Sequence, residues 1–277
     1  MTTWGVVASC WGLDPVAVAG CLAAAVAWVA AGRHGRGSAR VRPLPFALAV
    51  AVLVLALLSP IGQLAEGYLF SAHMLQHLLL VLVVPPLALL GLEPILSARP
   101  NPRAARVVLR PVVAWGLGVG AMWLWHERTL CDAAAQNALV HRVQELSLLT
   151  MGTAFWWPIL GPREGARLPP LGGVLYLFTA CTACTVLGIL ITFAPVRVCS
   201  VFAHPVDRLG VMPLVRDGWG LTPERDQQVG GLLMWVPACL VYGVGILAVL
   251  ARVFRDAEPD ATATGSVTMT TTTEEVR

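Results

Sequence analysis

The chain has 277 residues, of which 57% are hydrophobic and only 13% are charged, and its mean hydropathy is +0.72. Soluble domains carry about 25% charged residues, so this composition excludes an ordinary soluble globular protein. The formal net charge is +3, and every basic residue is an arginine. The lack of lysine excludes retinal Schiff-base chemistry, which needs a lysine amine, and we expect no nucleic-acid partner.

Seven apolar runs predict the fold class. A helix needs about 20 apolar residues to cross a hydrocarbon core of about 30 Å. The runs cover residues 16–31, 44–61, 69–90, 107–125, 139–160, 171–193 and 229–251. We therefore expect an all-α, polytopic membrane helix bundle of about seven transmembrane helices, in one domain over residues 1–255 that lies in a lipid bilayer. Residues 256–277 are rich in threonine and are predicted to form a disordered cytoplasmic tail.

The arginines predict the orientation, because short cytoplasmic loops are enriched in basic residues. Basic residues occur in alternate connections, namely those after the first, third and fifth runs, and in the segment after the seventh. They are Arg33, Arg36, Arg40, Arg42, Arg99, Arg103, Arg106, Arg163, Arg167, Arg252 and Arg255. This alternation predicts an N-terminus outside the cell, a long outer connection over residues 194–228 and a cytoplasmic C-terminus. Basic residues follow the first run rather than precede it, so we expect a retained helix instead of a cleaved signal peptide.

Two local patterns add expectations about the helices. Pro85 and Pro86 lie in the inner half of the third run, where proline is expected to kink or end a helix. Trp156 and Trp157 lie near the inner end of the fifth run, where tryptophan is typical of an aromatic anchor at the membrane interface.

Ionisable side chains inside a membrane span are costly and mark candidate functional sites. Histidines lie near the outer ends of three successive runs, and two of these runs have a polar pair spaced four residues apart. Such a pair lies on one helix face, with the deeper member about 6 Å further along the helix axis. The candidate metal ligands of the chain are His73, His77, Met122, His126, His141, Glu145, Asp226 and Met234.

Imidazole, thioether and carboxylate groups in converging positions predict a transition metal, and thioether with imidazole favours copper. Each residue also has a simpler interpretation, because methionine often fills gaps in a core and a single histidine near a helix end can be interfacial. Cys181 and Cys184 fit either a soft metal or helix packing, and we favour packing. An isolated Glu145 would stay protonated unless a cation lies beside it.

Five motifs follow one another in a fixed order along the chain. They are Ser71-Ala-His-Met-Leu-Gln-His77 with Pro85-Pro86, Trp125-His126, His141, Phe155-Trp-Trp-Pro158 with Gly161-Pro162, and Asp226-Gln-Gln-Val-Gly-Gly-Leu-Leu-Met-Trp235. As an ordered set they resemble the CtaG family of cytochrome c oxidase assembly factors, and the resemblance extends from about residue 71 to about residue 250.

The resemblance implies a multi-pass protein of a bacterial plasma membrane that matures a haem–copper oxidase. It implies that the protein is not an enzyme and that it supplies copper on the extracytoplasmic side to cytochrome c oxidase subunits. The family's histidine positions correspond to His73, His77, His126 and His141, and its last motif includes Asp226 and Met234.

This sequence departs from the family pattern at three places. Glu145 replaces a histidine, Glu127-Arg128 replaces a proline after the Trp-His pair, and Cys199-Ser-Val-Phe202 replaces a tyrosine-rich motif. Two other functions stay open at this point: a haem-binding membrane protein with two axial histidines, and a transporter of a small ion.

Overall fold

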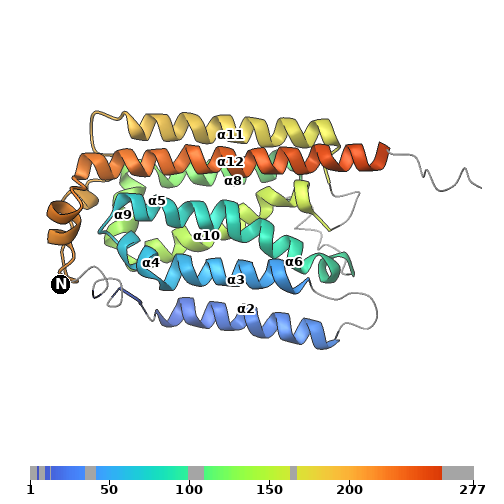
Figure 1. Cartoon of the computed structure of the whole chain (residues 1–277), viewed down its shortest axis with the longest axis horizontal. Coiled ribbons are helices and arrows are strands. Elements are labelled where there is room, and N and C mark those ends of the chain that lie inside the picture. The colour runs from blue at the N-terminus through green and yellow to red at the C-terminus, as the bar shows by residue number, and fades with distance from the viewer. Residues whose placement is uncertain are drawn as a thin grey trace, which may run out of the picture.

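The computed structural model describes residues 5, 10–12, 14–34, 42–98, 109–162 and 167–257, and this part of the chain contains helices and no strand. The helices lie side by side along one axis (Figure 1). Their bounds are α2 (Pro15–His34), α3 (Pro43–Leu58), α4 (Pro60–Ala65), α5 (Phe70–Leu78), η1 (Leu79–Val83), α6 (Val84–Ala98), α8 (Pro111–Trp125), α9 (Arg128–Gln136), α10 (Ala138–Leu160), α11 (Pro170–Thr192), η3 (Val201–Ala203), η4 (Leu214–Gly218) and α12 (Pro223–Ala257).

Each of the predicted apolar runs contains a helix, and the all-helical expectation is confirmed for the described residues. Three stretches are long and apolar enough to cross a membrane: Phe70–Glu93, Pro170–Thr192 and Pro223–Arg255. Shorter apolar helices cover Pro15–Val26, Pro43–Leu58 and Pro111–Trp125. Large apolar side chains such as Leu175, Phe178 and Leu240 are more than half exposed on α11 and α12. Apolar surface of this extent on long helices is typical of a protein that contacts lipid.

The second run is not one straight helix, because α3 ends at Leu58 and α4 begins at Pro60. Between them, Ser59 Oγ accepts a hydrogen bond from Ile61 N at 3.1 Å and caps α4. The chain then turns at Gly67, whose φ of 86° favours glycine. A Cβ atom at Gly67 would also lie 3.3 Å from Ala135 O, so α9 leaves little room for a side chain there.

The third run continues past its two prolines as α6, and the irregular part lies just before them. Residues Leu79–Val83 form a single π-helical turn, η1. Pro85 has no N–H to donate to Val81 O four residues earlier, and Trp156 Nε1 donates to that oxygen instead, at 3.1 Å. Trp156 and Trp157 are 3% and 9% exposed. The expectation of an interfacial anchor is therefore wrong for both, because both side chains lie in the core. Trp156 is buried there because the proline motif needs a hydrogen-bond donor.

The bundle has two unlike ends. The histidine end, on the left of Figure 1, contains α4, α9 and the described residues before α2. It also contains residues 193–222, and we call this segment the cap. The arginine end contains the C-terminal ends of α2, α6 and α10 and the N-terminal ends of α3, α8 and α11. There Glu93 pairs with Arg42 at 3.2 Å and with Arg167 at 3.1 Å. Other predicted basic residues and the predicted tail lie outside the described residues: Arg36, Arg40, Arg99, Arg103, Arg106, Arg163 and residues 258–277, together with the side chain of Arg33.

Candidate metal centre

Four histidines from three parts of the bundle meet beneath the histidine end. His73 and His77, one turn apart on α5, have ring centroids 4.2 Å apart. The ring of His141 on α10 lies 5.7 Å from that of His73, and the ring of His126, which follows α8, lies 5.4 Å from that of His77. All four side chains are buried, with exposures between 0% and 7%. The structure thus gathers the four predicted histidines into one cluster, which we call the histidine cluster.

Two of these rings are held in a defined tautomer by backbone carbonyls. His73 Nδ1 donates to Ala65 O at 3.2 Å, and His126 Nδ1 donates to Met122 O at 2.5 Å. In a neutral imidazole the other nitrogen then carries a lone pair that can accept a proton or bind a metal. A backbone carbonyl behind one ring nitrogen is the usual support for a metal-binding histidine.

Met74 is a member of the site that the sequence interpretation missed. Its side chain is fully buried, and its Sδ atom lies 3.1 Å from His126 Nε2. With Nδ1 of His126 donating to Met122 O, Nε2 and the thioether sulfur are both lone-pair acceptors. The only sequence signal for this role is that Met74 lies between the two histidines of the α5 motif.

Several polar atoms around the cluster have no hydrogen-bond partner among the described residues. They include His73 Nε2, His141 Nδ1, both ring nitrogens of His77 and both amide atoms of Gln144. Gln144 is the polar side chain beside His77, yet the two form no hydrogen bond of good geometry. Each such atom costs about 1–3 kcal/mol when it is buried without a partner. Folding alone therefore does not account for this cluster.

Glu145 has a protein cation beside it. Its Oε2 atom accepts a hydrogen bond from Arg142 Nη1 at 2.6 Å, and its Oε1 atom accepts one from Gln76 Nε2 at 2.9 Å. Oε1 also lies 3.3 Å from His141 Nε2. Of the two situations that the sequence leaves open for Glu145, the structure shows the one with a cation beside it, because Arg142 supplies the positive charge and the carboxylate contacts a ring of the cluster.

Arg142 ties three remote parts of the histidine end together. Its Nη2 atom donates to Asp14 Oδ2, before α2, and to Glu66 Oε1, after α4, each at 2.8 Å. Asp14 also accepts a hydrogen bond from the backbone N–H of Ala17, and this bond and Arg142 hold the pKa of Asp14 below its usual value. Neither carboxylate could be assigned to Arg142 from the sequence, since no spacing rule links residues so far apart.

The remaining predicted ligands have other surroundings. Asp226 is 1% exposed and caps the start of α5, where it accepts bonds from Phe70 N at 2.9 Å, Ser71 N at 3.0 Å and Ser71 Oγ at 2.6 Å. Met122 and Met234 are buried in the main apolar cluster. Helix capping and apolar packing explain the burial of these three residues without a metal.

The donor types of the histidine cluster fit copper, but their positions do not form a finished coordination shell. Within the described ranges, no three His, Cys, Asp or Glu side chains are close enough around one point to hold an ion. Imidazole nitrogens and a thioether are the ligands that copper prefers. Some of the rings would have to turn about their side-chain bonds for three of them to reach one ion.

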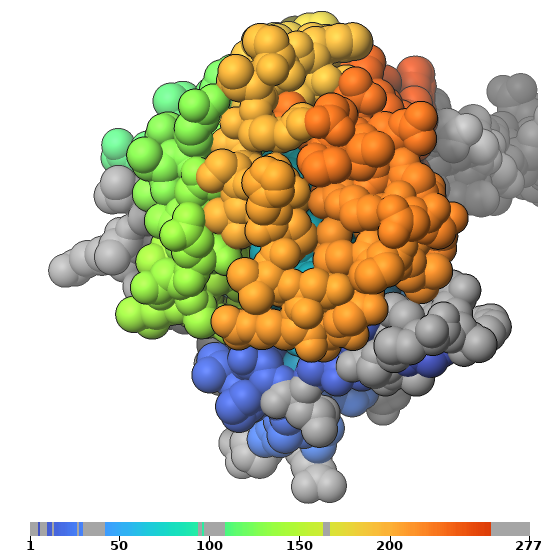
Figure 2. Space-filling model, turned by 90° about the vertical axis from the view of Figure 1, so that its left-hand side faces the viewer, coloured from blue at the N-terminus to red at the C-terminus, as the bar shows by residue number. Residues whose placement is uncertain are grey.

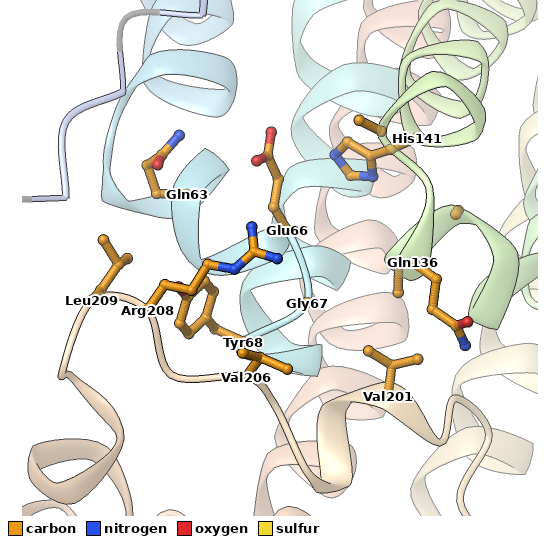
Figure 3. A pocket seen from close by; sticks show the side chains of 13 residues that line it. Gln63, Glu66, Gly67, Tyr68, Gln136, His141, Val201, Val206, Arg208 and Leu209 are labelled. Carbon is orange, nitrogen blue, oxygen red and sulfur yellow. The ribbon is translucent and has the colours of Figure 1, made fainter.

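A cavity of about 630 Å³ reaches the cluster from the histidine end. Figure 3 shows Glu66, Arg208 and His141 around this space, with Tyr68 below them. Its other walls come from the end of α9 and from the cap. Figure 2 views the same end, where the orange cap covers most of the surface and leaves small gaps above the teal region of α5. His141 is thus the histidine of the cluster that borders the cavity.

The family model for the cytochrome c oxidase caa3 assembly factor matches residues 22–256. The chain belongs to this assembly-factor family. The match includes the whole histidine cluster, Met74 and Glu145, and it begins after Asp14. The resemblance seen in the sequence motifs is therefore confirmed.

Curated relatives extend the comparison to longer proteins. An uncharacterized protein of Mycobacterium leprae is 25% identical over 205 residues, which is 66% of this chain and 30% of the relative. An uncharacterized protein of Mycobacterium bovis is 24% identical over 188 residues, which is 60% of this chain and 27% of the relative. The chain thus spans less than a third of the length of these relatives. No solved structure matches the chain.

Cys181 and Cys184 lie apart from this site, where α11 meets α12. Cys181 Sγ is 3.0 Å from Cys239 Sγ, and Cys184 Sγ is 3.6 Å from the hydroxyl of Tyr242. These contacts place both cysteines in a helix interface, which agrees with the packing interpretation.

Proposed function

We propose that this assembly factor binds copper at the histidine cluster, on the extracytoplasmic side of a bacterial plasma membrane, and passes it to a cytochrome c oxidase subunit. The helices form seven transmembrane spans, with the N-terminus outside and the C-terminus in the cytoplasm. The family supplies the link to the oxidase, and the residues below support the metal and the side of the membrane.

One observation carries the choice of copper: His126 Nε2 and Met74 Sδ face each other at 3.1 Å in the protein interior. Two acceptors at this distance repel each other unless a proton or a cation lies between them. A nitrogen–sulfur pair suits a soft or borderline cation such as copper and suits magnesium or calcium poorly. His73 Nε2 and His77 add unpartnered nitrogens within the same cluster.

The positions of the arginines support the orientation. The described basic residues Arg42 and Arg167 lie in short connections at the end of the bundle opposite to the histidine cluster. The arginines of the cap belong to a long connection, which has little weight in this rule. Because arginine-rich connections stay in the cytoplasm, the histidine end then faces outward. Copper would reach His141 from the aqueous side through the cavity, without crossing the hydrocarbon core.

In this proposal Glu145 is a positioning residue and not the first ligand. Its carboxylate lies beside His141 Nε2 and is held by Arg142 and Gln76. A carboxylate next to an imidazole orients the ring and raises its basicity, which strengthens metal binding by the other nitrogen. The replacement of a family histidine by Glu145 is then compatible with a working site.

Copper titration of the purified full chain tests the proposal. We expect the double variant His73→Ala/His77→Ala to weaken copper binding by more than about 100-fold, because two donor groups are lost. His204→Ala is the matched control, since His204 is an exposed histidine of the cap, and it should bind copper like the wild type. Equal loss in both variants, or no loss in either, would contradict the site. An absorbance spectrum of the same sample with a Soret band would instead support the haem-binding alternative.

A further inference from the structure

Two cysteines meet at the histidine end, outside the long helices. Cys131 lies on α9 and is 0% exposed, and Cys199 lies in the cap and is 3% exposed. Both belong to the same buried cluster, and the thiol of Cys131 lies within interaction range of that of Cys199. The two cysteines are 68 positions apart in the sequence, so the fold, and not the local sequence, brings them together.

The residues that follow the two cysteines hold the segments in register. Asp132 Oδ1 accepts a hydrogen bond from Ser200 N at 2.7 Å, and Asp132 Oδ2 accepts one from Ser200 Oγ at 3.0 Å. Asp132 Oδ1 also accepts a longer bond from Val201 N at 3.4 Å. The backbone of the cap is thus fixed against α9 directly beside Cys131 and Cys199, which favours one defined approach of the two sulfurs.

We propose that Cys131 and Cys199 form a disulfide that fastens the cap to α9. The inference rests on the proposed placement of the histidine end outside the cytoplasm, where disulfides form and persist. Each cysteine loses its thiol hydrogen and one S–S bond forms. The oxidant is the disulfide of an extracytoplasmic thiol oxidase, which is reduced to two thiols through a mixed-disulfide intermediate.

The burial of the two cysteines determines at which stage of folding the disulfide can form. The thiol of Cys131 and the burial of the side chain raise the pKa of Cys199 well above its usual value. Exchange needs a thiolate that is accessible to the oxidant. The disulfide therefore forms during folding, before the cap closes over α9.

The disulfide acts on the walls of the cavity. The last turn of α9 lines it through Ala134, Ala135 and Gln136, and the cap lines it through Val201 and Val206. The disulfide joins these two walls next to the place where they meet. It keeps the width of the passage to His141 constant.

The chain supplies an internal control in Cys181 and Cys239. Their sulfur atoms lie 3.0 Å apart, yet they lie halfway along α11 and α12. The centre of a membrane span offers neither thiolate nor a water-soluble oxidant. This pair should stay reduced although its sulfurs are in contact.

Thiol counting by mass spectrometry tests the proposal. The full chain is isolated in its membrane, denatured without reductant in the presence of N-ethylmaleimide, and weighed. We expect two of the seven cysteines to remain unlabelled, and all seven to be labelled after reduction. Digestion should give one cross-linked peptide pair that contains Cys131 and Cys199.

Variants and proteolysis sharpen the same test. Cys131→Ser and Cys199→Ser should each leave no cysteine unlabelled, whereas Cys239→Ser should still leave two.

Reduction of the wild type should speed trypsin cleavage after Arg208, an exposed residue of the cap, by about tenfold. Seven labels without reductant, or a cross-link between any other pair, would overturn the inference. Copper titration of the same samples distinguishes the two proposals. Copper binding by a protein with seven free thiols would contradict the disulfide alone. A disulfide in a protein that does not bind copper would contradict the metal site alone.

Discussion

The two halves of α10 differ in whether their buried polar groups have hydrogen-bond partners. In the half near the arginine end, Trp156 Nε1 donates to Val81 O at 3.1 Å and Phe155 O accepts from the hydroxyl of Tyr176 at 2.8 Å. About 22 Å along the same helix, His141 Nδ1 and the amide of Gln144 have no partner among the described residues. A buried polar group with a partner stabilises the fold, and one without a partner destabilises it unless a ligand binds. Along α10, this contrast distinguishes a structural half from a functional half.

The largest expected effect is that of removing Arg142 from the functional half. Arg142→Met should lower the free energy of unfolding by about 3–5 kcal/mol, because it leaves the buried carboxylate of Glu145 without its cation. The double variant Arg142→Met/Glu145→Gln should recover most of this loss. Unfolding in mixtures of detergent and dodecyl sulfate measures both. A loss below about 1 kcal/mol in the single variant would show that the ion pair does not hold this end together.

Trp156→Phe tests the structural half with a smaller effect. The substitution keeps an aromatic ring in the core and leaves Val81 O without a donor, so we expect a loss of about 1–3 kcal/mol in the free energy of unfolding. Trp115→Phe is the matched control, since Trp115 Nε1 is buried without a partner among the described residues. The same unfolding assay should find the control nearer to the wild type. Equal losses would mean that ring volume, and not the hydrogen bond, explains the effect of Trp156.

The smallest effect is expected for His77→Phe in the copper-free protein. Both ring nitrogens of His77 are buried without a partner, so an apolar ring of similar size should change the free energy of unfolding by less than about 1 kcal/mol, and towards greater stability. Copper should raise the unfolding midpoint of the wild type and not that of the variant. A large loss of stability without copper would place His77 in the structural half and remove the distinction between the halves.

Hydrophobic length made most of the helices predictable, and the irregular parts were not. Runs of about 20 apolar residues indicate helices whatever their partners are, but they hide the break at Ser59 and the π-helical turn of η1. Helix α9 was missed because it is short and its cap is Glu127, whose Oε2 atom accepts bonds from Thr129 N and Leu130 N. Glutamate is a weak signal for a helix start compared with serine, threonine, aspartate or asparagine. Trp156 was misplaced because its buried partner, Val81 O, leaves no trace in composition.

Spacing along single helices predicted the candidate site only in part. The pairs His73/His77 and His141/Glu145 share helix faces, as the four-residue period requires, and the structure brings these faces together. The partners of Arg142 come from other helices, so no periodicity could reveal them. His126 directly follows the last residue of α8, as expected, and its ring contacts that of the deeper His77.

The π-helical turn over Leu79–Val83 has a consequence for how related sequences are compared. A π turn contains one residue more than the α-helical turn it replaces, and one residue corresponds to about 100° of rotation around a helix. The side chains before Leu79 and those after Val83 therefore follow two helical patterns that are offset from each other by about 100° around the helix axis. A relative that lacks one residue in this turn would keep the composition of the helix, yet His73 and His77 would face a different neighbour. Sequence alignments across this turn should accordingly be anchored on each side separately, on the histidines before it and on Pro85 after it.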